Sequence, residues 1–268
     1  MEVAQSPQWK RIIGRVAFLN CDPLFYGLGD EWQVLPAPPS WLTGHLLRRD
    51  CVLAPIPAAD YARHADELVL VPEIGICSKG EVGSVLVFGD MPLSTMKSIA
   101  LPTDSMTSVA LLKYILKQEQ LEPQTHLMGP DLTTMLSECD GALLIGDRAL
   151  EEAKKQPERV QLDLGQAWLN RTQKPMVFGV FAARKDTPIE DVQAAQEALL
   201  HRLSHFETDP VTRKAVIEWS MSKSDLKYER LNRYFGEVFN RLDPEHIQGL
   251  EQFLVDACNL TEGSSFAW

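Results

Sequence analysis

The chain has 268 residues, enough to form one large domain or two smaller ones around a substantial core. An apolar content of 45% and a charged content of 24% are typical of globular proteins. The formal net charge is −11 and no basic cluster occurs, which argues against binding to nucleic acids or anionic membranes. An anionic ligand would therefore depend on local hydrogen-bond donors, such as helix N-termini.

The cysteines and the N-terminal residues indicate a cytoplasmic protein. The five cysteines form an odd number without C-x-x-C spacing, so neither a disulfide framework nor a zinc site is indicated, and we expect most of them in the core. Residues 1–11 lack the apolar run of a signal peptide, and no long apolar stretch follows. We expect no membrane segment and a cytoplasmic location.

From residue 11 to about residue 90, short apolar runs alternate with helical patterns. The predicted strands are 15–19, 32–35, 51–56 and 84–88, and the predicted helices are 41–49 and 58–64. Asn20 directly follows the first strand, and Ser40 is a plausible N-cap of the first helix.

A second block with the same alternation begins near residue 91. Its predicted strands are 98–101, 125–128 and 141–145, and its predicted helices are 105–118, 132–139 and 147–155. Such alternation predicts largely parallel sheets. Beyond residue 188 the pattern is almost entirely helical, with predicted helices 189–207, 210–220 and 244–257.

The two blocks predict an α/β protein with two lobes facing a cleft. Segments 84–88 and 175–183 would carry the chain between a first lobe of residues 11–90 plus 182–268 and a second lobe of residues 91–181. Ligands of open α/β sheets bind beyond the carboxyl ends of the strands. The residues that we expect there are Asn20, Ser40, Ser105, Gly146 and Asp147.

The start of the predicted helix 105–118 is the strongest local signal for a ligand. Ser105, Thr107 and Ser108 place three hydroxyl groups in its first turn, where backbone N–H groups lack intrahelical partners. This arrangement suits a carboxylate or phosphate. Simple capping, which needs only one hydroxyl, is the alternative interpretation.

Other candidate sites are weaker. No common nucleotide, metalloprotease or hydrolase motif occurs. His201 and His205 have helical i, i+4 spacing but lie in a strongly charged region, which favours a solvated helix face over a metal site. Asp140 and Asp147 could form a carboxylate pair for proton transfer, but strand direction would leave only Asp147 near the cleft. Asp147 could instead simply cap the following helix.

Seven segments in order resemble the chorismate dehydratase family of the futalosine route to menaquinone. They are FLNCDPLFYGL, PSWLTGHL, APIPAADY, SKGEVGSVLV, ALPTDSMTSVALLKYIL, GALLIGDRAL, and DLGQAW followed by KPMVFGVFAAR. Gln173-Lys174 and Leu101-Pro102 depart from the usual family pattern, on loops. The resemblance implies the fold of type II periplasmic binding proteins, in which two lobes joined by two crossing strands hold a ligand between them.

The resemblance also implies a reaction and a set of site residues. Dehydration of the dianion chorismate yields 3-[(1-carboxyvinyl)oxy]benzoate, and aromatisation makes this favourable without a metal or redox cofactor. Asn20 would face the leaving hydroxyl or the developing charge, and either Asp147 or a substrate carboxylate would be the base. The expected substrate-binding residues are Ser40, Ser84, Ser105, Thr107, Ser108 and Gly146.

Two alternatives remain open at the level of sequence. One is a non-catalytic solute-binding or sensor domain of the same fold. The other is the sister enzyme of the same pathway, 1,4-dihydroxy-6-naphthoate synthase, although none of the six histidines lies in a predicted cleft motif. The sequence is compatible with either a monomer or a homodimer.

Overall fold

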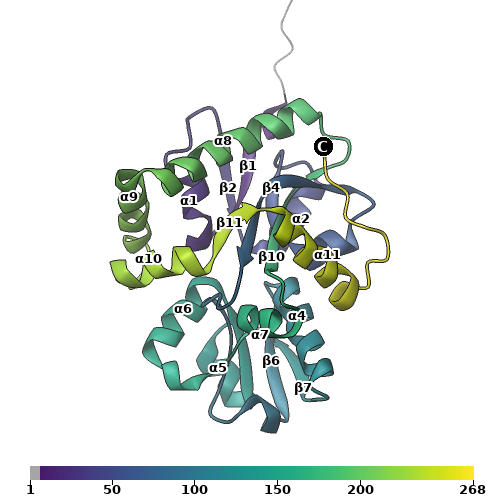
Figure 1. Cartoon of the computed structure of the whole chain (residues 1–268), viewed down its shortest axis with the longest axis vertical. Helices are drawn as coiled ribbons and strands as arrows, with labels where there is room; N and C mark the ends of the chain where they lie inside the picture. Colours follow the sequence, from purple (N-terminus) through teal and green to yellow (C-terminus); the bar gives the residue numbers. More distant parts are fainter. Residues whose placement is uncertain (1–6) are drawn as a thin grey trace, which may run out of the picture.

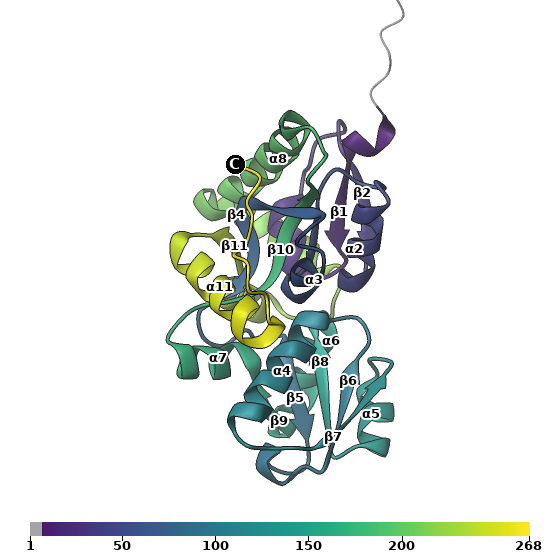
Figure 2. The same ribbon diagram turned by 90° about the vertical axis from the view of Figure 1, so that its right-hand side faces the viewer.

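The computed structural model describes residues 7–268, and its strands form three hydrogen-bonded sheets. Residues 1–6, on which part of the signal-peptide argument rests, lie outside this range. Figures 1 and 2 show two lobes stacked along the long axis of the molecule, with the second lobe drawn in the teal shades of the middle of the chain. The predicted two-lobed α/β architecture is confirmed.

The first lobe is built on a four-stranded sheet of order β11-β4-β10-β3. Its strands are β3 (Ala54–Pro57), β4 (Leu68–Ser78), β10 (Met176–Arg184) and β11 (Phe239–Leu242). The parallel pair β1 (Ile12–Val16) and β2 (Gln33–Ala37) adjoins it, because Gly14 N–H donates to Leu53 O at 2.9 Å.

The helices of the first lobe come from both ends of the chain (Figure 1). The early ones are η1 (Gln8–Arg11), η2 (Leu19–Cys21), α1 (Asp22–Phe25), α2 (Pro39–Leu47) and α3 (Ala58–Arg63). The late ones are α8 (Ile189–Thr208), α9 (Pro210–Met221), α10 (Tyr228–Glu237) and α11 (Pro244–Cys258).

The second lobe contains a five-stranded sheet of order β7-β6-β8-β5-β9. Its strands are β5 (Val85–Gly89), β6 (Ser98–Pro102), β7 (Gln124–Met128), β8 (Gly141–Ile145) and β9 (Val160–Asp163). Its helices are η3 (Leu93–Thr95), α4 (Met106–Gln118), α5 (Leu132–Glu138), α6 (Gly146–Lys155), η4 (Pro157–Arg159) and α7 (Leu164–Thr172).

Sheet pairing places the changes of lobe earlier in the chain than the sequence pattern suggested. β5 pairs with β8 and β9, so it belongs to the second sheet, and β10 pairs along its length with β4 of the first sheet. The chain therefore crosses in residues 79–84 and 173–175. We propose these segments as lobe boundaries in place of residues 90 and 182.

The sequence of strand β5 is apolar throughout because both faces of the strand are buried. Val85 and Val87 pack into the main hydrophobic core, whereas Leu86 and Phe88 pack into a smaller cluster on the other face of the sheet. A strand buried on both faces has no polar alternation. The cysteines behave as expected: all five are free, and four are buried.

No helix formed by residues 7–268 combines the length and the apolar character that crossing a bilayer requires.

Candidate functional site

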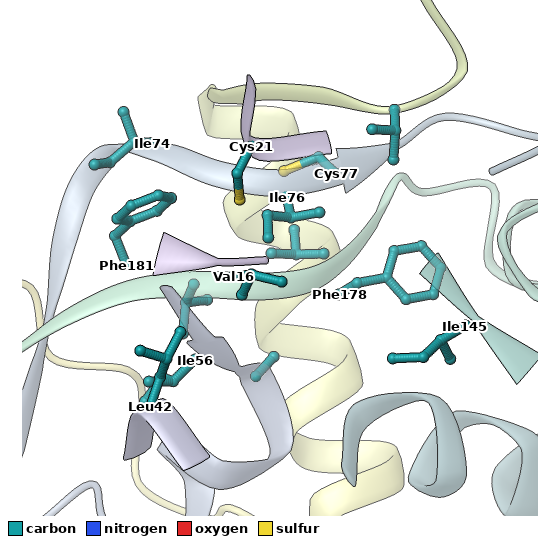
Figure 3. Packing of buried hydrophobic residues seen from close by; sticks show 14 of the residues in the cluster. Val16, Cys21, Leu42, Ile56, Ile74, Ile76, Cys77, Ile145, Phe178 and Phe181 are labelled. Atoms are coloured by element: carbon teal, nitrogen blue, oxygen red, sulfur yellow. The ribbon is translucent and has the colours of Figure 1, made fainter. Parts of the chain in front are cut away.

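A cleft between the two lobes has walls from both of them. The space between its wall atoms is about 520 Å³, part of it open to solvent. Figure 3 shows Phe178 of β10 and Ile145 of β8, two of the apolar side chains that line it. The complete lining is Val16, Phe18, Asn20, Pro39, Pro55, Ile56, Pro57, Ile76, Val82, Ser84, Val85, Ser105, Ser108, Ile145, Gly146, Phe178, Gly179 and Val238.

The structure brings five of the predicted site residues to this cleft. They are Asn20, Ser84, Ser105, Ser108 and Gly146. The other three, Ser40, Thr107 and Asp147, are not among the residues that line it.

Asn20 is the most exceptional polar group in the cleft. It lies in the short helix η2, which is separated from the end of β1 by two residues, and only 7% of its surface is exposed. Its Oδ1 atom is buried without a hydrogen-bond partner. An unpaired buried amide oxygen is costly, and this atom is free to accept a hydrogen bond from a group bound in the cleft.

A buried ion cluster holds the chain immediately after Asn20. The Asp22 carboxylate is fully buried and accepts hydrogen bonds from Lys223 Nζ at 2.6 and 2.7 Å and from Ser220 Oγ at 2.6 Å. Arg15 also forms an ion pair with it. Burial lowers the pKa of Lys223, although its bond to Asp22 opposes this effect.

This cluster was not found by sequence reasoning, because its cations lie far apart along the chain. Asp22 and Lys223 are separated by 201 positions, and only Asp22 lies in one of the segments that carry the family resemblance. The one available signal was the acidic residue in the segment FLNCDPLFYGL, two positions after Asn20.

Asp147 reaches from the second lobe to the turn that carries Asn20. Leu19 N–H donates to its Oδ1 at 3.0 Å and its Oδ2 at 3.3 Å. The prediction that Asp147 caps its own helix is wrong, since Ile145 is the N-cap of α6. Burial raises the pKa of Asp147 to about 7 despite the bond from Leu19.

The start of α4 presents two of its three predicted hydroxyl groups to the cleft. Ser105 is the N-cap: its Oγ accepts from Ser108 N–H at 3.4 Å and donates to Ser108 Oγ at 2.9 Å. Thr107 faces elsewhere, since its Oγ1 accepts from Ala59 N–H of α3 at 3.1 Å. The Thr107 hydroxyl therefore forms a hydrogen bond between the two lobes, and neither partner belongs to the cleft lining.

Ser84 and Gly146 form the part of the cleft next to the first crossing segment. Tyr234 donates its hydroxyl to Ser84 Oγ at 3.1 Å, and burial raises the pKa of Tyr234, which keeps it a donor. Gly146 N–H donates to Ser84 O at 2.7 Å. Gly146 has φ of 64°, and a Cβ atom there would lie 2.9 Å from the Phe18 ring.

Ser40 lies at the edge of the cleft, beside the lining residue Pro39. The prediction that it caps its helix is wrong, because α2 begins at Pro39 and its N-cap is Pro38. Its Oγ atom is nevertheless buried and without a hydrogen-bond partner, one residue away from the cleft wall.

The chemistry of the cleft follows from what its described lining contains. Its polar side chains are one amide and three serine hydroxyls, and none of the described lining residues carries a titratable side chain. The Asp140–Asp147 pair does not form, because Asp140 binds Lys97 N–H and Ser98 N–H at the opposite end of β8. The cleft can bind, orient and desolvate a small molecule.

Structural comparisons show the fold. The chain is similar to the protein AF1704 from Archaeoglobus fulgidus, with a TM-score of 0.71 and 17% identity over 92% of this chain and 96% of that one. It is also similar to the periplasmic aliphatic sulphonate binding protein SsuA from Escherichia coli, with a TM-score of 0.65 and 14% identity over 94% of each chain.

Sequence comparisons identify the family. The chain is 35% identical over 205 residues to a chorismate dehydratase from Thermus thermophilus, covering 70% of this chain and 75% of that protein. The profile of a family described as menaquinone biosynthesis matches residues 12–258. This chain therefore belongs to the menaquinone biosynthesis family.

Proposed function

We propose that the protein is a chorismate dehydratase, a hydro-lyase that converts chorismate to 3-[(1-carboxyvinyl)oxy]benzoate and water. The observation that carries the proposal is the unpartnered, buried Asn20 Oδ1 in a cleft that also contains the N-terminus of α4. Membership of the family and the relative from Thermus thermophilus support the same reaction.

The carboxylates of chorismate would bind at local donors. We assign one carboxylate to Ser105, Ser108 and the first N–H groups of α4, where the helix dipole favours negative charge. Ser84 and the unpartnered hydroxyl of Ser40 would contact the other. Such donors suit an acidic protein whose described cleft lining contains no cation.

The proposed reaction removes the C3 hydrogen as a proton and the C4 hydroxyl with its bonding electrons, which together form water. The electrons of the C3–H bond complete an aromatic ring. Negative charge that develops at C3 is conjugated through the ring to the C1 carboxylate. Donors at that carboxylate therefore stabilise the transition state more than the ground state.

The lining of the cleft supports one of the two candidate proton acceptors. The sequence left Asp147 and a substrate carboxylate as alternatives. Both Asp147 oxygens face Leu19 N–H, and Asp147 is not among the residues that line the cleft. We therefore propose that a carboxylate of chorismate itself takes the proton, while Asn20 orients the substrate or its leaving hydroxyl.

Turnover of chorismate by the purified protein tests this function. The expected result is a product lighter than chorismate by one water, with the ultraviolet spectrum of a substituted benzoate, formed at the same rate with or without EDTA. Tight binding of chorismate without product would favour a binding role. A protein that neither binds nor converts chorismate would contradict the proposal.

A further inference from the structure

The turn that carries Asn20 is tied down by two carboxylates outside the cleft. Asp22, two positions after Asn20, is held by the ion cluster of the first lobe. Leu19 N–H, one position before Asn20, is held by Asp147 of the second lobe. The Oδ1 atom of Asn20 has no hydrogen-bond partner. The orientation of the Asn20 side chain therefore depends on how its backbone is held by the contacts of Leu19 and Asp22.

We infer that Asp147 is a positioning residue that acts through Asn20, because its carboxylate caps η2 from the opposite lobe and thereby aims the Asn20 amide into the cleft. This inference rests on the proposed dehydratase function. It replaces the role of general base that the sequence left open for Asp147.

The contacts of Asp147 are those of a helix cap supplied from another element. A capping oxygen normally comes from the residue before the helix, yet η2 begins after Phe18, which provides no side-chain cap. Asp147 supplies this oxygen across 128 positions of the chain. It also lies in the first turn of α6, where the helix dipole stabilises its charge.

The surroundings of Asp147 agree with a structural acceptor that is partly shielded from solvent. Burial and the negative charges of Asp22 and Glu151 raise its pKa, whereas Leu19 N–H and Lys223 lower it. The ionisable side chains that face it from the packed elements are Cys21, Asp22, Glu151, Lys223 and Tyr234. None of these five residues lines the cleft. They therefore offer no chain of groups that could carry a proton from the cleft to Asp147.

Replacement of Asp147 by asparagine and by alanine separates positioning from proton transfer. Asparagine keeps an oxygen that can accept from Leu19 N–H but cannot act as a base at neutral pH. We expect Asp147→Asn to retain kcat for chorismate within about fivefold of the parent. We expect Asp147→Ala to lower kcat about 10- to 100-fold with little change in KM, since a misplacement of about 1 Å costs this much.

A double-mutant cycle with Asn20→Ala tests whether Asp147 acts through Asn20. Once Asn20 is removed, we expect Asp147→Ala to lower kcat by no more than about threefold further. Asp131→Ala is the matched control, because Asp131 caps its own helix α5 within the second lobe. It should lower the melting temperature and leave kcat unchanged.

Each outcome supports or overturns the inference. An Asp147→Asn variant as impaired as Asp147→Ala would make the carboxylate itself essential, and fully multiplicative effects in the cycle would remove the link to Asn20. A fully active Asp147→Ala variant would overturn the inference while leaving the dehydratase function in place. A parent protein that does not convert chorismate would overturn both.

Discussion

The hydroxyl of Thr107 illustrates how one residue can serve the fold in a place where a ligand contact was expected. Its Oγ1 is the acceptor for the buried Ala59 N–H, and the residue is only 1% exposed. Ser108, one position later, faces the cleft instead. Successive residues of a helix point about 100° apart, so neighbouring hydroxyls reach different partners.

We expect Thr107→Val to destabilise the protein without weakening substrate binding. The change leaves Ala59 N–H unsatisfied, which should lower the free energy of unfolding by about 1–3 kcal/mol. Urea unfolding measures this loss, and Thr107→Ser should largely restore stability. Ser108→Ala should show the reverse pattern, with KM for chorismate raised about ten- to hundredfold. Equal KM values for the parent and Ser108→Ala would place the carboxylate site elsewhere.

Asn20 should affect the chemical step more than substrate binding. If its amide contacts the leaving hydroxyl or developing charge, Asn20→Ala should lower kcat about 10²- to 10³-fold and change KM little. Asn20→Asp should be at least as harmful, because a carboxylate would repel a dianionic substrate. The melting temperature should hardly change, since Oδ1 has no partner in the protein. A large loss of stability with proportionate loss of activity would make Asn20 a turn residue only.

At the scale of elements, the backbone conformation of Gly146 and its lack of a side chain allow the cleft wall to pack closely at the start of α6. It begins α6 with a positive φ, and its missing side chain leaves room for the Phe18 ring. Arg148 lies over the same ring, with its Cζ atom 5.9 Å from the ring centroid. Phe18 of the first lobe is thereby packed against the first turn of a helix in the second.

We expect Gly146→Ala to impair both stability and activity. The left-handed conformation costs a non-glycine residue about 1–2 kcal/mol, and the new Cβ would displace Phe18 from the cleft wall. Thermal unfolding and kcat/KM for chorismate measure the two effects. Gly129→Ala is the control, because a Cβ there meets no atom within 4 Å. If the two variants behave alike, Phe18 does not need this close approach.

The sequence predicted elements with strong local periodicity and missed those defined by distant partners. β8 has the bounds predicted for it, and α4 begins at Met106, one position after the predicted start at residue 105. β4 was missed because Pro72 and Gly75 interrupt its pattern, and Glu73 has a positive φ. Its pairing with β10 and β11 stabilises this irregular strand, and no local pattern reveals such pairing.

The same distinction applies to the candidate site. Asn20, Ser84 and Ser105 could be placed because each lies next to the end of a strand or the start of a helix. The orientation of Thr107 and the partners of Asp22 and Asp147 depend on which segments meet in three dimensions. Local sequence specifies chemical groups, whereas tertiary contacts decide which of them face the cleft.

At the scale of the whole molecule, the interlobe contact of Asp147 should couple stability to pH. Its folded-state pKa is raised to about 7, mainly by burial, whereas an aspartate in the unfolded chain has its ordinary pKa of about 3.9. Between these pH values the folded protein holds a proton that the unfolded chain has lost. The contribution of Asp147 to stability therefore falls as pH rises from about 4 to about 7.

We expect Asp147→Asn to remove this component of the pH dependence. The free energy of unfolding, measured with urea at pH 5, 6, 7 and 8, should decline less with rising pH in the variant than in the parent. The difference between the two curves isolates Asp147 from the other titrating groups. Parallel curves would show that the folded-state pKa of Asp147 is close to its ordinary value.

The order of segments in the sheets has a consequence for how the protein is assembled during synthesis. β4 lies at the centre of the first sheet, yet its neighbours β10 and β11 come from residues 176–184 and 239–242. The strands of the second lobe, residues 85–163, are complete before either of these neighbours is synthesised. On the ribosome the second lobe can fold first, while β4 emerges with both edges unpaired and remains exposed to aggregation until the last third of the chain appears.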